Sequence, residues 1–429
     1  MIEFICDLCF YVLKVIYEFV FLMLDFERLM IPIIPTHVLN LDNRYWFNGD
    51  IRDYGVPAAT RHVSKDDDGQ TITGELYHPY ESLPSDYTDM AVKFYTATTN
   101  TPPYVEIKGS PLKLLQGHNV YGFDSLELGT YHMIGMLLEA FPKLAPILDV
   151  ANTELSCLDT TYLIRLPHQN MVQPVLDYMA NLASGHRKAR EVKYHNYISW
   201  GNDGASVRPK AYGKFEEVKE QLSKIQKQAD KGCQRSRSLV IAMSNALPFA
   251  NAVIRLEGRI TKDYLTKNGY PTNIWKLIEF QKNQPDLLLH LWRVAFNPIF
   301  DTMKGKYMNF ADDDELLQVL MTNLVTYTKK GNPSYTRAYN ALDFYRSLRT
   351  DGWVKVKGRH QENRFYVRVR QLTDCGISKS HLQNLHKNPN GKVIPFVRLL
   401  ELKMCDQLPS DYQVPTSPYM PKEHLHLVA

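Results

Sequence analysis

Alternating polar and apolar positions predict β-strands in the first part of the chain. Residues 31–125 contain two runs rich in β-branched and aromatic residues, at 90–98 and 103–110, and proline or glycine signals break each run. In the second run Glu106 and Lys108 share one face, while the valine and isoleucine beside them share the other. These runs are typical of strands with two unlike faces.

Helical and strand patterns then alternate up to residue 303. Strands are predicted at 155–166 and 252–260, and helices at 126–149, 171–185, 215–232 and 273–303. The 252–260 strand is the clearest, because Arg255, Glu257 and Arg259 lie on one face and apolar residues on the other. This order predicts an α+β fold: a mostly antiparallel sheet with helices on one face, whose other face is free to hold a site.

A change in composition marks a boundary near residue 304. The string KGKYMNFADDDE (304–315) has the character of a linker, and the remaining residues are helix-rich with basic strings such as KVKGRHQENRFYVRVRQ. We therefore expect a first domain over 23–305 and a smaller helix-rich C-terminal domain over 308–429.

The N-terminal segment is very apolar but carries four charges at helical spacing, which form one polar stripe: Glu3, Asp7, Lys14 and Glu18. It has no basic first region and no small-residue cleavage site, so it is not a typical secretory signal. The four charges also argue against a membrane-spanning helix. Three interpretations stay open: a helix packed on the domain, a membrane-surface helix, or an extension upstream of a second start at Met23 or Met30. The first and third are favoured.

The overall composition changes this picture little. The chain has 429 residues, 44% hydrophobic and 22% charged, which is typical of a folded soluble protein. A net charge of +4 does not by itself indicate nucleic-acid binding. Six irregularly spaced cysteines predict no disulfide framework and favour a reducing compartment. Cys6 and Cys9 form a CxxC pair with no second pair at zinc spacing, so they are interpreted as neighbours on a helix.

Tyr212 is a candidate nucleophile. In the short run 210–215, expected to be extended, Lys210, Tyr212 and Lys214 point the same way. Two flanking ammonium groups would favour the phenolate of a tyrosine and attract a phosphodiester. The alternative is a half-exposed tyrosine at a strand end, because the chain has 26 tyrosines.

Two acidic residues lie inside predicted strands, where carboxylates are uncommon and costly to bury unpaired: Asp159 in CLDTTYLI and Glu257 in RLEGRI. Such carboxylates, with water and phosphate oxygens, suit a hard ion such as Mg²⁺. The alternatives are structural. Glu257 would pair with Arg255 or Arg259, and Asp159 would bond to a strand end or a turn.

A Gly-His-Asn loop offers further ligands. His118 could give its imidazole to a metal ion and Asn119 its amide to a phosphate. The alternative is an exposed loop histidine without a function. The chain has no glycine-rich phosphate loop, no noteworthy Ser-His-Asp order and no metalloprotease helix.

Several strings, in order along the chain, resemble the replication initiator encoded by gene II of filamentous phages. The most specific are the QGHN loop within VEIKGSPLKLLQGHNVYG (105–122) and CGISKSHLQNL (375–385). The others are HPYESLPSDY (78–87), LDTTYLIRLP (158–167), KAYGK (210–214), RLEGRI…YLTKNGYP (255–271), DFYRSLRTDGW (343–353) and VIPFVRLLEL (393–402). The resemblance covers residues 23–429, and residues 1–22 have no counterpart in it.

This resemblance implies a rolling-circle endonuclease and strand transferase. Such proteins nick the viral strand of a duplex replicative form at its origin, stay joined to the 5′ phosphate, and later rejoin the displaced strand into a circle. The freed 3′ hydroxyl primes synthesis by the host helicase and polymerase. The implied partners are duplex origin DNA and single-stranded viral DNA in the host bacterial cytoplasm, and an oligomer on DNA is compatible with this. A membrane partner is not expected.

The resemblance also assigns residues. The family's Tyr-x-Lys motif falls on Tyr212 and Lys214. An acidic strand residue and an Arg-x-Glu strand of plasmid rolling-circle initiators map onto Asp159 and Glu257, which with His118 would hold Mg²⁺. The wider nuclease superfamily has two histidines in its metal motif, whereas only His118 stands near that place here. DNA contacts are expected from Asn119, Lys210, Arg255 and Arg259.

The family makes a shorter product from an internal start, which Met308 matches. The product, 308–429, would bind single-stranded DNA and limit replication. Its phosphate contacts are expected from Lys355, Lys357, Arg359, Arg364, Arg368 and Arg370, with Trp353, Phe365 and Tyr366 to stack on bases. The alternative is a solvated basic face.

A rival interpretation of the whole chain makes it a non-enzymatic, origin-binding replication regulator, in which the acids and Tyr212 are structural. A third, a membrane-associated scaffold, depends on residues 1–24 alone.

Overall fold

A computed structural model describes residues 22–41, 44–56, 61–65, 71–75, 80–184, 187–188, 197–202, 204–303, 313–386 and 407–421. The predicted extension up to residue 21 and the linker with Met308 lie outside these residues. Within them, no helix combines the length and apolar character that a membrane crossing requires.

The chain forms two compact units, and each consists of segments that are separate in the sequence. The first contains residues 1–165, 214–293 and 404–429, and the second contains 166–213 and 294–403. The predicted domains 23–305 and 308–429 divide the chain differently and stay a prediction. Both units cross residue 305, and the last segment belongs to the first unit.

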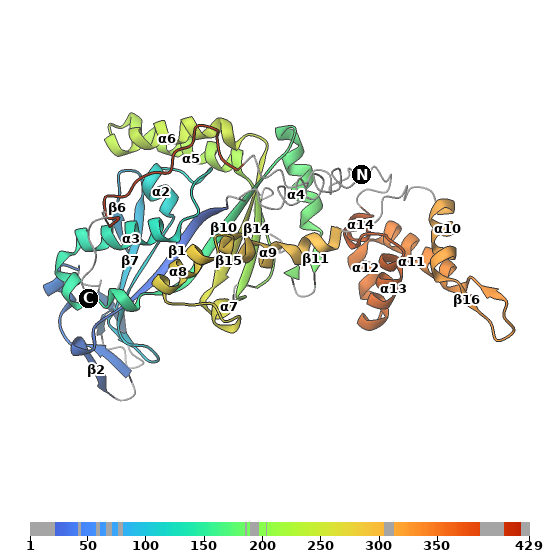
Figure 1. Cartoon of the computed structure of the whole chain (residues 1–429), viewed down its shortest axis with the longest axis horizontal. Helices are drawn as coiled ribbons and strands as arrows, with labels where there is room; N and C mark the ends of the chain where they lie inside the picture. Colours follow the sequence, from blue (N-terminus) through green and yellow to red (C-terminus); the bar gives the residue numbers. More distant parts are fainter. Residues whose placement is uncertain are drawn as a thin grey trace, which may run out of the picture. The chain divides into compact units, whose positions relative to one another are not determined.

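An antiparallel sheet forms the centre of the first unit (Figure 1). Its strands are β1 (Met23–Pro32), β6 (Glu81–Pro84), β7 (Asp89–Tyr95), β9 (Tyr104–Gly109), β10 (Glu154–Arg165) and β15 (Val253–Thr261). They lie in the order β15-β10-β1-β9-β7-β6, and each neighbouring pair is antiparallel. Four of them match the strands predicted from polar and apolar alternation.

Helices cover this sheet where its strands turn apolar side chains outward. They are α2 (Pro111–Gln116), α3 (Leu126–Ala140), α5 (Lys214–Asp230), α6 (Gln234–Ala250), α7 (Lys262–Lys267), α8 (Ile274–Asn283) and α9 (Leu287–Phe300), which ends in the second unit. Ser110 and Ser125 cap α2 and α3, because each side-chain oxygen accepts from a backbone N–H in the first turn.

The sheet has a covered face and a half-exposed face over β1, β9 and β7. In β1 the residues Glu27, Leu29 and Ile31 are buried on the side of α3, whereas Arg28 and Met30 on the other side are half-buried. This confirms the predicted antiparallel sheet with helices on one face. In β10 and β15 nearly every residue is buried, so these strands are covered on both faces.

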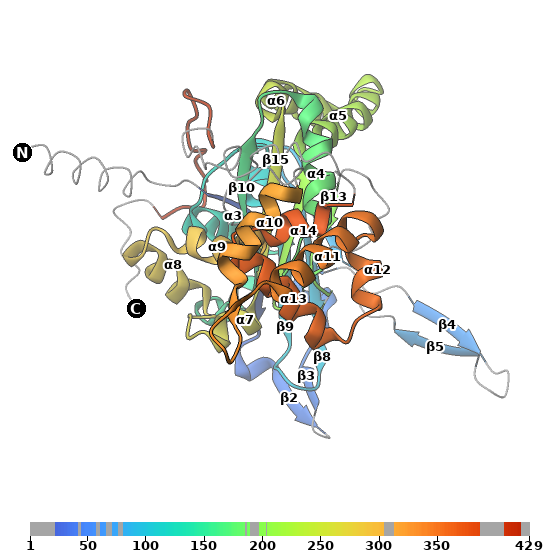
Figure 2. The ribbon, with the colours of Figure 1, turned by 90° about the vertical axis from the view of Figure 1, so that its right-hand side faces the viewer.

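The second unit contains a hairpin and a bundle of helices. The hairpin is β13 (Tyr197–Ser199) with β14 (Val207–Gly213), and α4 (Val172–Ala180) packs on it. The bundle contains α10 (Asp313–Leu324), α11 (Thr336–Asp351), α12 (Trp353–Gly358), α13 (Glu362–Asp374) and α14 (Lys379–Asn384). Figure 2 shows α11 to α14 gathered together, around a core that includes Phe344, Tyr345 and Phe365. This confirms the helix-rich C-terminal region.

The remaining elements are short. A three-stranded sheet joins β2 (Val38–Leu41), β3 (Arg44–Phe47) and β8 (Ala97–Thr98), and three hairpins pair β4 (Arg61–Lys65) with β5 (Thr71–Glu75), β11 (Ala183–Ser184) with β12 (Arg187–Lys188), and β16 (Thr326–Tyr327) with β17 (Pro333–Ser334). Single 3₁₀ turns lie at Pro35–His37, Ile51–Tyr54, Pro142–Ile147, Val150–Asn152, Gln169–Met171 and Asp301–Met303.

Candidate active site

A β-bulge places a buried aspartate at the start of the central strand β1. Leu24 pairs with Thr160 and Phe26 pairs with Asp159, so Asp25 is the extra residue with no partner opposite. The Asp25 carboxylate accepts a hydrogen bond from Asn119 Nδ2 at 2.7 Å. It also pairs with the Arg255 guanidinium at 2.8 Å. Sequence analysis missed Asp25. The available signal was a charged residue inside the apolar run MLDF.

Lys214 is the second buried charge at this place. Its side chain is fully buried, and its ammonium donates to Asn119 Oδ1 at 2.8 Å and to Glu217 Oε2 at 2.6 Å. Lys214 is the first residue of α5, not a third position of an extended run, because β14 ends at Gly213. The sequence-based expectation that Lys214 extends the strand beside Tyr212 is therefore wrong.

Arg255 joins the two parts into one network. Its guanidinium donates to the Asn119 carbonyl oxygen and, at 3.3 Å, to Thr161 Oγ1. We call the following residues the buried polar network: Asp25, Asn119, Thr161, Lys214, Glu217 and Arg255. Three of the predicted site residues, Asn119, Lys214 and Arg255, are therefore together. The carboxylates that neutralise them came from positions the sequence patterns did not indicate.

Burial and mutual charge set the protonation of this network. Burial lowers the pKa of Lys214 to about 8, although the neighbouring Glu217 carboxylate acts in the opposite direction. Burial alone would raise the pKa of Asp25, but the charges of Arg255 and Lys214 and the Asn119 hydrogen bond hold it below its ordinary value. The pKa of Glu217 is lowered in the same way, mainly by Lys214 against the effect of burial. Both carboxylates are thus ionised at neutral pH.

His118 lies beside this network and is buried, not exposed. Its ring packs edge-on against Tyr121 with 4.6 Å between centroids, and Gln116 Nε2 lies 3.3 Å from its Nδ1. Burial, together with the charges of Lys214 and Arg255, lowers the pKa of His118 to about 4. The imidazole is therefore neutral at physiological pH, as a metal ligand or an acceptor would be.

The predicted metal ligands do not meet in this structure. Asp159 accepts two hydrogen bonds of 2.6 Å from the Arg259 guanidinium, one on each oxygen. Glu257 is buried on β15 between Arg255 and Arg259. Within the described ranges, no three His, Cys, Asp or Glu side chains come close enough together to hold a metal ion. The residues Asp159, Glu257 and His118 therefore do not fit a shared Mg²⁺ in this arrangement.

Tyr212 belongs to the β13–β14 hairpin of the second unit. It is half-buried, as are Arg208 and Lys210, which alternate with buried residues along β14. Tyr197 lies directly opposite, and the two rings stack with 6.1 Å between centroids. Lys210 and Tyr212 therefore share one side of the strand, as predicted.

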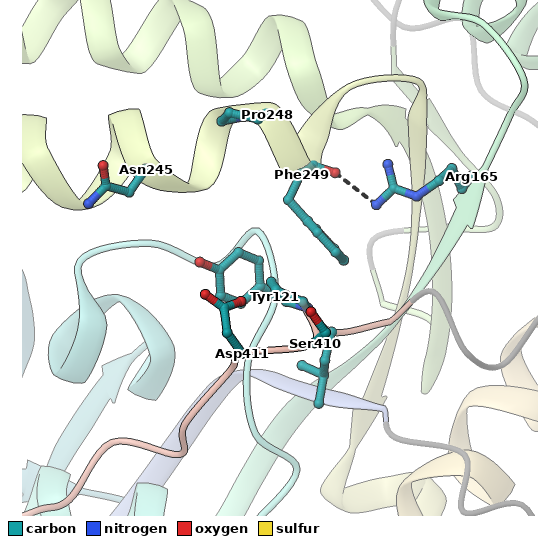
Figure 3. Close-up of a pocket in the computed structure, with 9 residues that line it drawn as sticks. Tyr121, Arg165, Asn245, Pro248, Phe249, Ser410 and Asp411 are labelled. Carbon is teal, nitrogen blue, oxygen red and sulfur yellow. Dashed lines mark hydrogen bonds between the residues drawn. The ribbon is translucent and has the colours of Figure 1, made fainter.

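A pocket of about 790 Å³ opens in the first unit beside His118 and its neighbour Tyr121. Figure 3 shows Tyr121 and Phe249 facing it, with Arg165 bonded to the Phe249 carbonyl oxygen. The C-terminal segment 407–421 closes its other side through Ser410 and Asp411. Tyr412 of this segment donates to Gln116 Oε1 at 3.1 Å, which ties the segment to the His118 loop.

The C-terminal basic residues predicted to contact DNA have varied surroundings. Lys355 and Arg364 are exposed, whereas Lys357 donates to Glu362 at 2.8 Å and to the Tyr366 hydroxyl at 3.1 Å. Arg368 is half-buried beside the Phe344 ring. Phe365 is fully buried in the bundle core, so the expectation that it stacks on bases is wrong. Its apolar ring completes the core of a small unit, which outweighs exposure to a ligand.

Comparison with known proteins identifies the family. Residues 17–284 match the family of the N-terminal part of the phage replication-associated protein encoded by gene II, and residues 327–418 match the family of its C-terminal part. The chain is 32% identical to the replication-associated protein of Salmonella phage IKe, covering 85% of this chain and 88% of that protein. It is 32% identical to the proteins of the same name from Enterobacteria phages fd and M13, covering 84% of this chain and 90% of each. The chain belongs to the gene II family of phage replication-associated proteins.

Proposed function

We propose that this protein initiates rolling-circle replication by nicking one strand of a duplex phage origin with Tyr212 and later rejoining the displaced strand. Membership of a replication-associated family supports the process. The observation that carries the chemistry is the position of Lys214, two residues after Tyr212 in the Tyr-x-Lys string, where its ammonium is anchored in the buried polar network. The chain leaving the nucleophile is thus fixed by charged contacts.

The proposed reaction exchanges one phosphodiester for another. The Tyr212 phenolic oxygen forms a bond to phosphorus, and the bond from phosphorus to the 3′ oxygen breaks. The phenol loses one proton and the leaving 3′ oxygen gains one. The 5′ phosphate stays on Tyr212, and the free 3′ hydroxyl serves as a primer. Attack by a 3′ hydroxyl on the phosphotyrosine reverses these steps and closes the circle without a nucleotide cofactor.

The network has a positioning role in this proposal. Complete burial and two close partners keep the Lys214 ammonium at Asn119 and Glu217. We therefore assign Lys214 to fixing the chain that follows Tyr212, not to direct contact with a phosphoryl oxygen. Arg255 holds the Asp25 side of the same network from β15.

Mg²⁺ stays a proposed cofactor. The ion would supply charge to the scissile phosphate, but the residues predicted to hold it do not fit a shared site, and no step above uses it. The role of a product starting at Met308 is likewise a proposal, and its basic exposed residues Lys355 and Arg364 are compatible with DNA binding.

Replacement of the nucleophile tests the proposed function. Tyr212→Phe removes the attacking oxygen and retains the ring, so nicking of a supercoiled origin plasmid and the covalent protein–DNA adduct should both disappear. Origin binding, measured by gel shift, should persist. Tyr197→Phe is the matched control, because it alters the stacked partner on the same hairpin.

Two outcomes would overturn the assignment. An adduct formed by Tyr212→Phe would place the nucleophile elsewhere. Wild-type protein that binds the origin but leaves the plasmid supercoiled, with and without Mg²⁺, would identify a non-enzymatic replication regulator. Mapping the modified tyrosine in the trapped wild-type adduct gives an independent answer.

A further inference from the structure

The half-exposed face of the main sheet carries a cluster of aromatic and basic side chains away from the buried polar network. The strand register places Arg28, Lys108 and Ala91 in one row across β1, β9 and β7. Met30, Glu106 and Lys93 form the next row, and Pro32, Tyr104 and Tyr95 the third. Directly opposite residues share a face, so these side chains form one surface. We call its members the aromatic–basic face: Arg28, Tyr80, Lys93, Tyr95, Tyr104 and Lys108.

The rings on this face are arranged for stacking. Tyr95 and Tyr104 are neighbours across two strands, and their rings are nearly parallel with 4.5 Å between centroids. Both are half-buried, so each ring is fixed by the sheet and still accessible. Tyr80 is exposed beside them. A row of fixed tyrosine rings on an open sheet gives flat apolar surface at little cost in conformational entropy.

The cations lie between and above these rings. The Lys108 ammonium is 3.3 Å from the centroid of Tyr80, and the Lys93 ammonium is 4.7 Å from that of Tyr95. Arg28 pairs with the buried Glu106 carboxylate at 2.7 Å, and the Tyr80 hydroxyl donates to the same carboxylate. Three cations thus surround one carboxylate, and the face carries net positive charge. Burial, with the charge of Arg28 beside it, lowers the pKa of Lys108, so an added anion would stabilise its charged form.

We infer that the aromatic–basic face binds single-stranded DNA, with bases stacking on Tyr95 and Tyr104 and backbone phosphates at Lys93, Lys108 and Arg28. Alternating rings and cations match a strand whose bases and phosphates are both accessible, because every base offers a ring face and every linkage a charge. A duplex hides its base faces, and a flat sheet does not enter its grooves. The inference rests on the proposed function only for the choice of DNA over RNA.

Binding to a labelled oligothymidylate tests this inference, with full-length protein carrying Tyr212→Phe so that no cleavage interferes. The double change Tyr95→Ala and Tyr104→Ala should weaken binding by about tenfold or more, from the stacking of one or two bases. Replacement of both by Phe should retain binding, because the rings remain. Trp46→Ala, an exposed aromatic outside this face, is the matched control.

The charges are tested separately through salt dependence. Lys93→Gln with Lys108→Gln should reduce the slope of log affinity against log salt by about 1.4, since each phosphate contact on single strands contributes roughly 0.7. Lys267→Gln, at an exposed position on α7, should leave the slope unchanged.

Unchanged affinity in the folded alanine variant would overturn the inference, as would a loss confined to duplex DNA. Folding is checked by thermal unfolding, and leucine at both tyrosine positions replaces alanine if that variant unfolds. Failure of Tyr212 to form an adduct would leave these binding results intact, so the two proposals fail independently.

Discussion

Lys214 Nζ lies 2.8 Å from Asn119 Oδ1, and the Asn119 amide nitrogen lies 2.7 Å from the Asp25 carboxylate, so one asparagine joins two opposite charges that are both buried. Each of its polar groups meets a partner of the matching kind, which is how a folded chain can bury charge without a large cost.

Removing the cation of this network should be strongly destabilising. Lys214→Met leaves Glu217 and Asn119 without their donor, and loss of one partner of a buried pair costs about 3–5 kcal/mol. Urea unfolding should show this loss, together with a large fall in plasmid nicking. Lys224→Met is the control, because its pair with Glu220 is exposed and worth less than about 1 kcal/mol. Equal effects of the two changes would contradict a structural role for the network.

Replacing the buried carboxyl of Glu27 should stabilise the protein. Glu27 is fully buried beside α3, and among the described residues its Oε2 has no hydrogen-bond partner. Burial raises its pKa from 4.5 to about 8. The folded state therefore binds more protons than the unfolded state between these values, and stability falls as the pH rises through this window.

Glu27→Gln abolishes this titration. The variant should be more stable than wild type at the upper end of the window, by a few kcal/mol at most, because a tenfold change in proton affinity corresponds to about 1.36 kcal/mol. Urea midpoints measured at both ends of the window decide the matter. A wild-type protein whose stability does not fall across it would show that Glu27 is ionised in the folded state.

The pair of Asp159 and Arg259 can be separated from a metal site by titration. Asp159→Asn removes the charge from a bidentate pair and should lower stability by about 3 kcal/mol, toward the lower end for a broken buried pair. Arg259→Gln should have a similar effect, and the double variant should lose less than the sum.

Nicking assays across Mg²⁺ concentrations complete that comparison. If Asp159 acts only through Arg259, the Mg²⁺ concentration for half-maximal rate should be the same in wild type and Asp159→Asn. A marked increase for Asp159→Asn alone would show that Asp159 binds the ion and that the pair opens during the reaction.

Gln407 completes the edge of β10. The pairing of β1 with β10 ends at Met23, and beyond it the Gln407 amide accepts from Leu163 N–H at 2.9 Å and donates to Leu163 C=O at 2.8 Å. Gln407→Ala leaves two buried backbone groups unpaired, which should cost about 1–3 kcal/mol of unfolding free energy. Gln226→Ala, whose amide bonds only to exposed Asp230, should change stability little.

The sequence predicted the strands well and the site only in part. The β7, β9, β10 and β15 strands follow directly from local alternation, which depends on nearest neighbours. Asp25 could not be found this way, because its role arises from a bulge that brings β1 to Arg255, a residue 230 positions away. The same limit applies to Lys214, whose burial depends on the start of α5 and on Asn119.

The second unit shows the opposite error. A basic string around Phe365 suggested an aromatic ring ready for a ligand, yet periodicity in α13 turns that ring into the core. Apolar residues on an amphipathic helix serve the core first. The tyrosines of the aromatic–basic face escaped attention for a related reason. Their alternation with lysines has meaning only when three strands are aligned.

The position of Gln407 has a consequence for synthesis of the chain. The amide that closes β10 comes from a residue made 244 positions after Leu163, the residue it pairs with. During translation the first unit can assemble its sheet but not its last edge, and an incomplete polypeptide keeps the Leu163 backbone groups open to other chains or to proteases. Completion of the polypeptide is thereby recorded in the stability of its earliest strands.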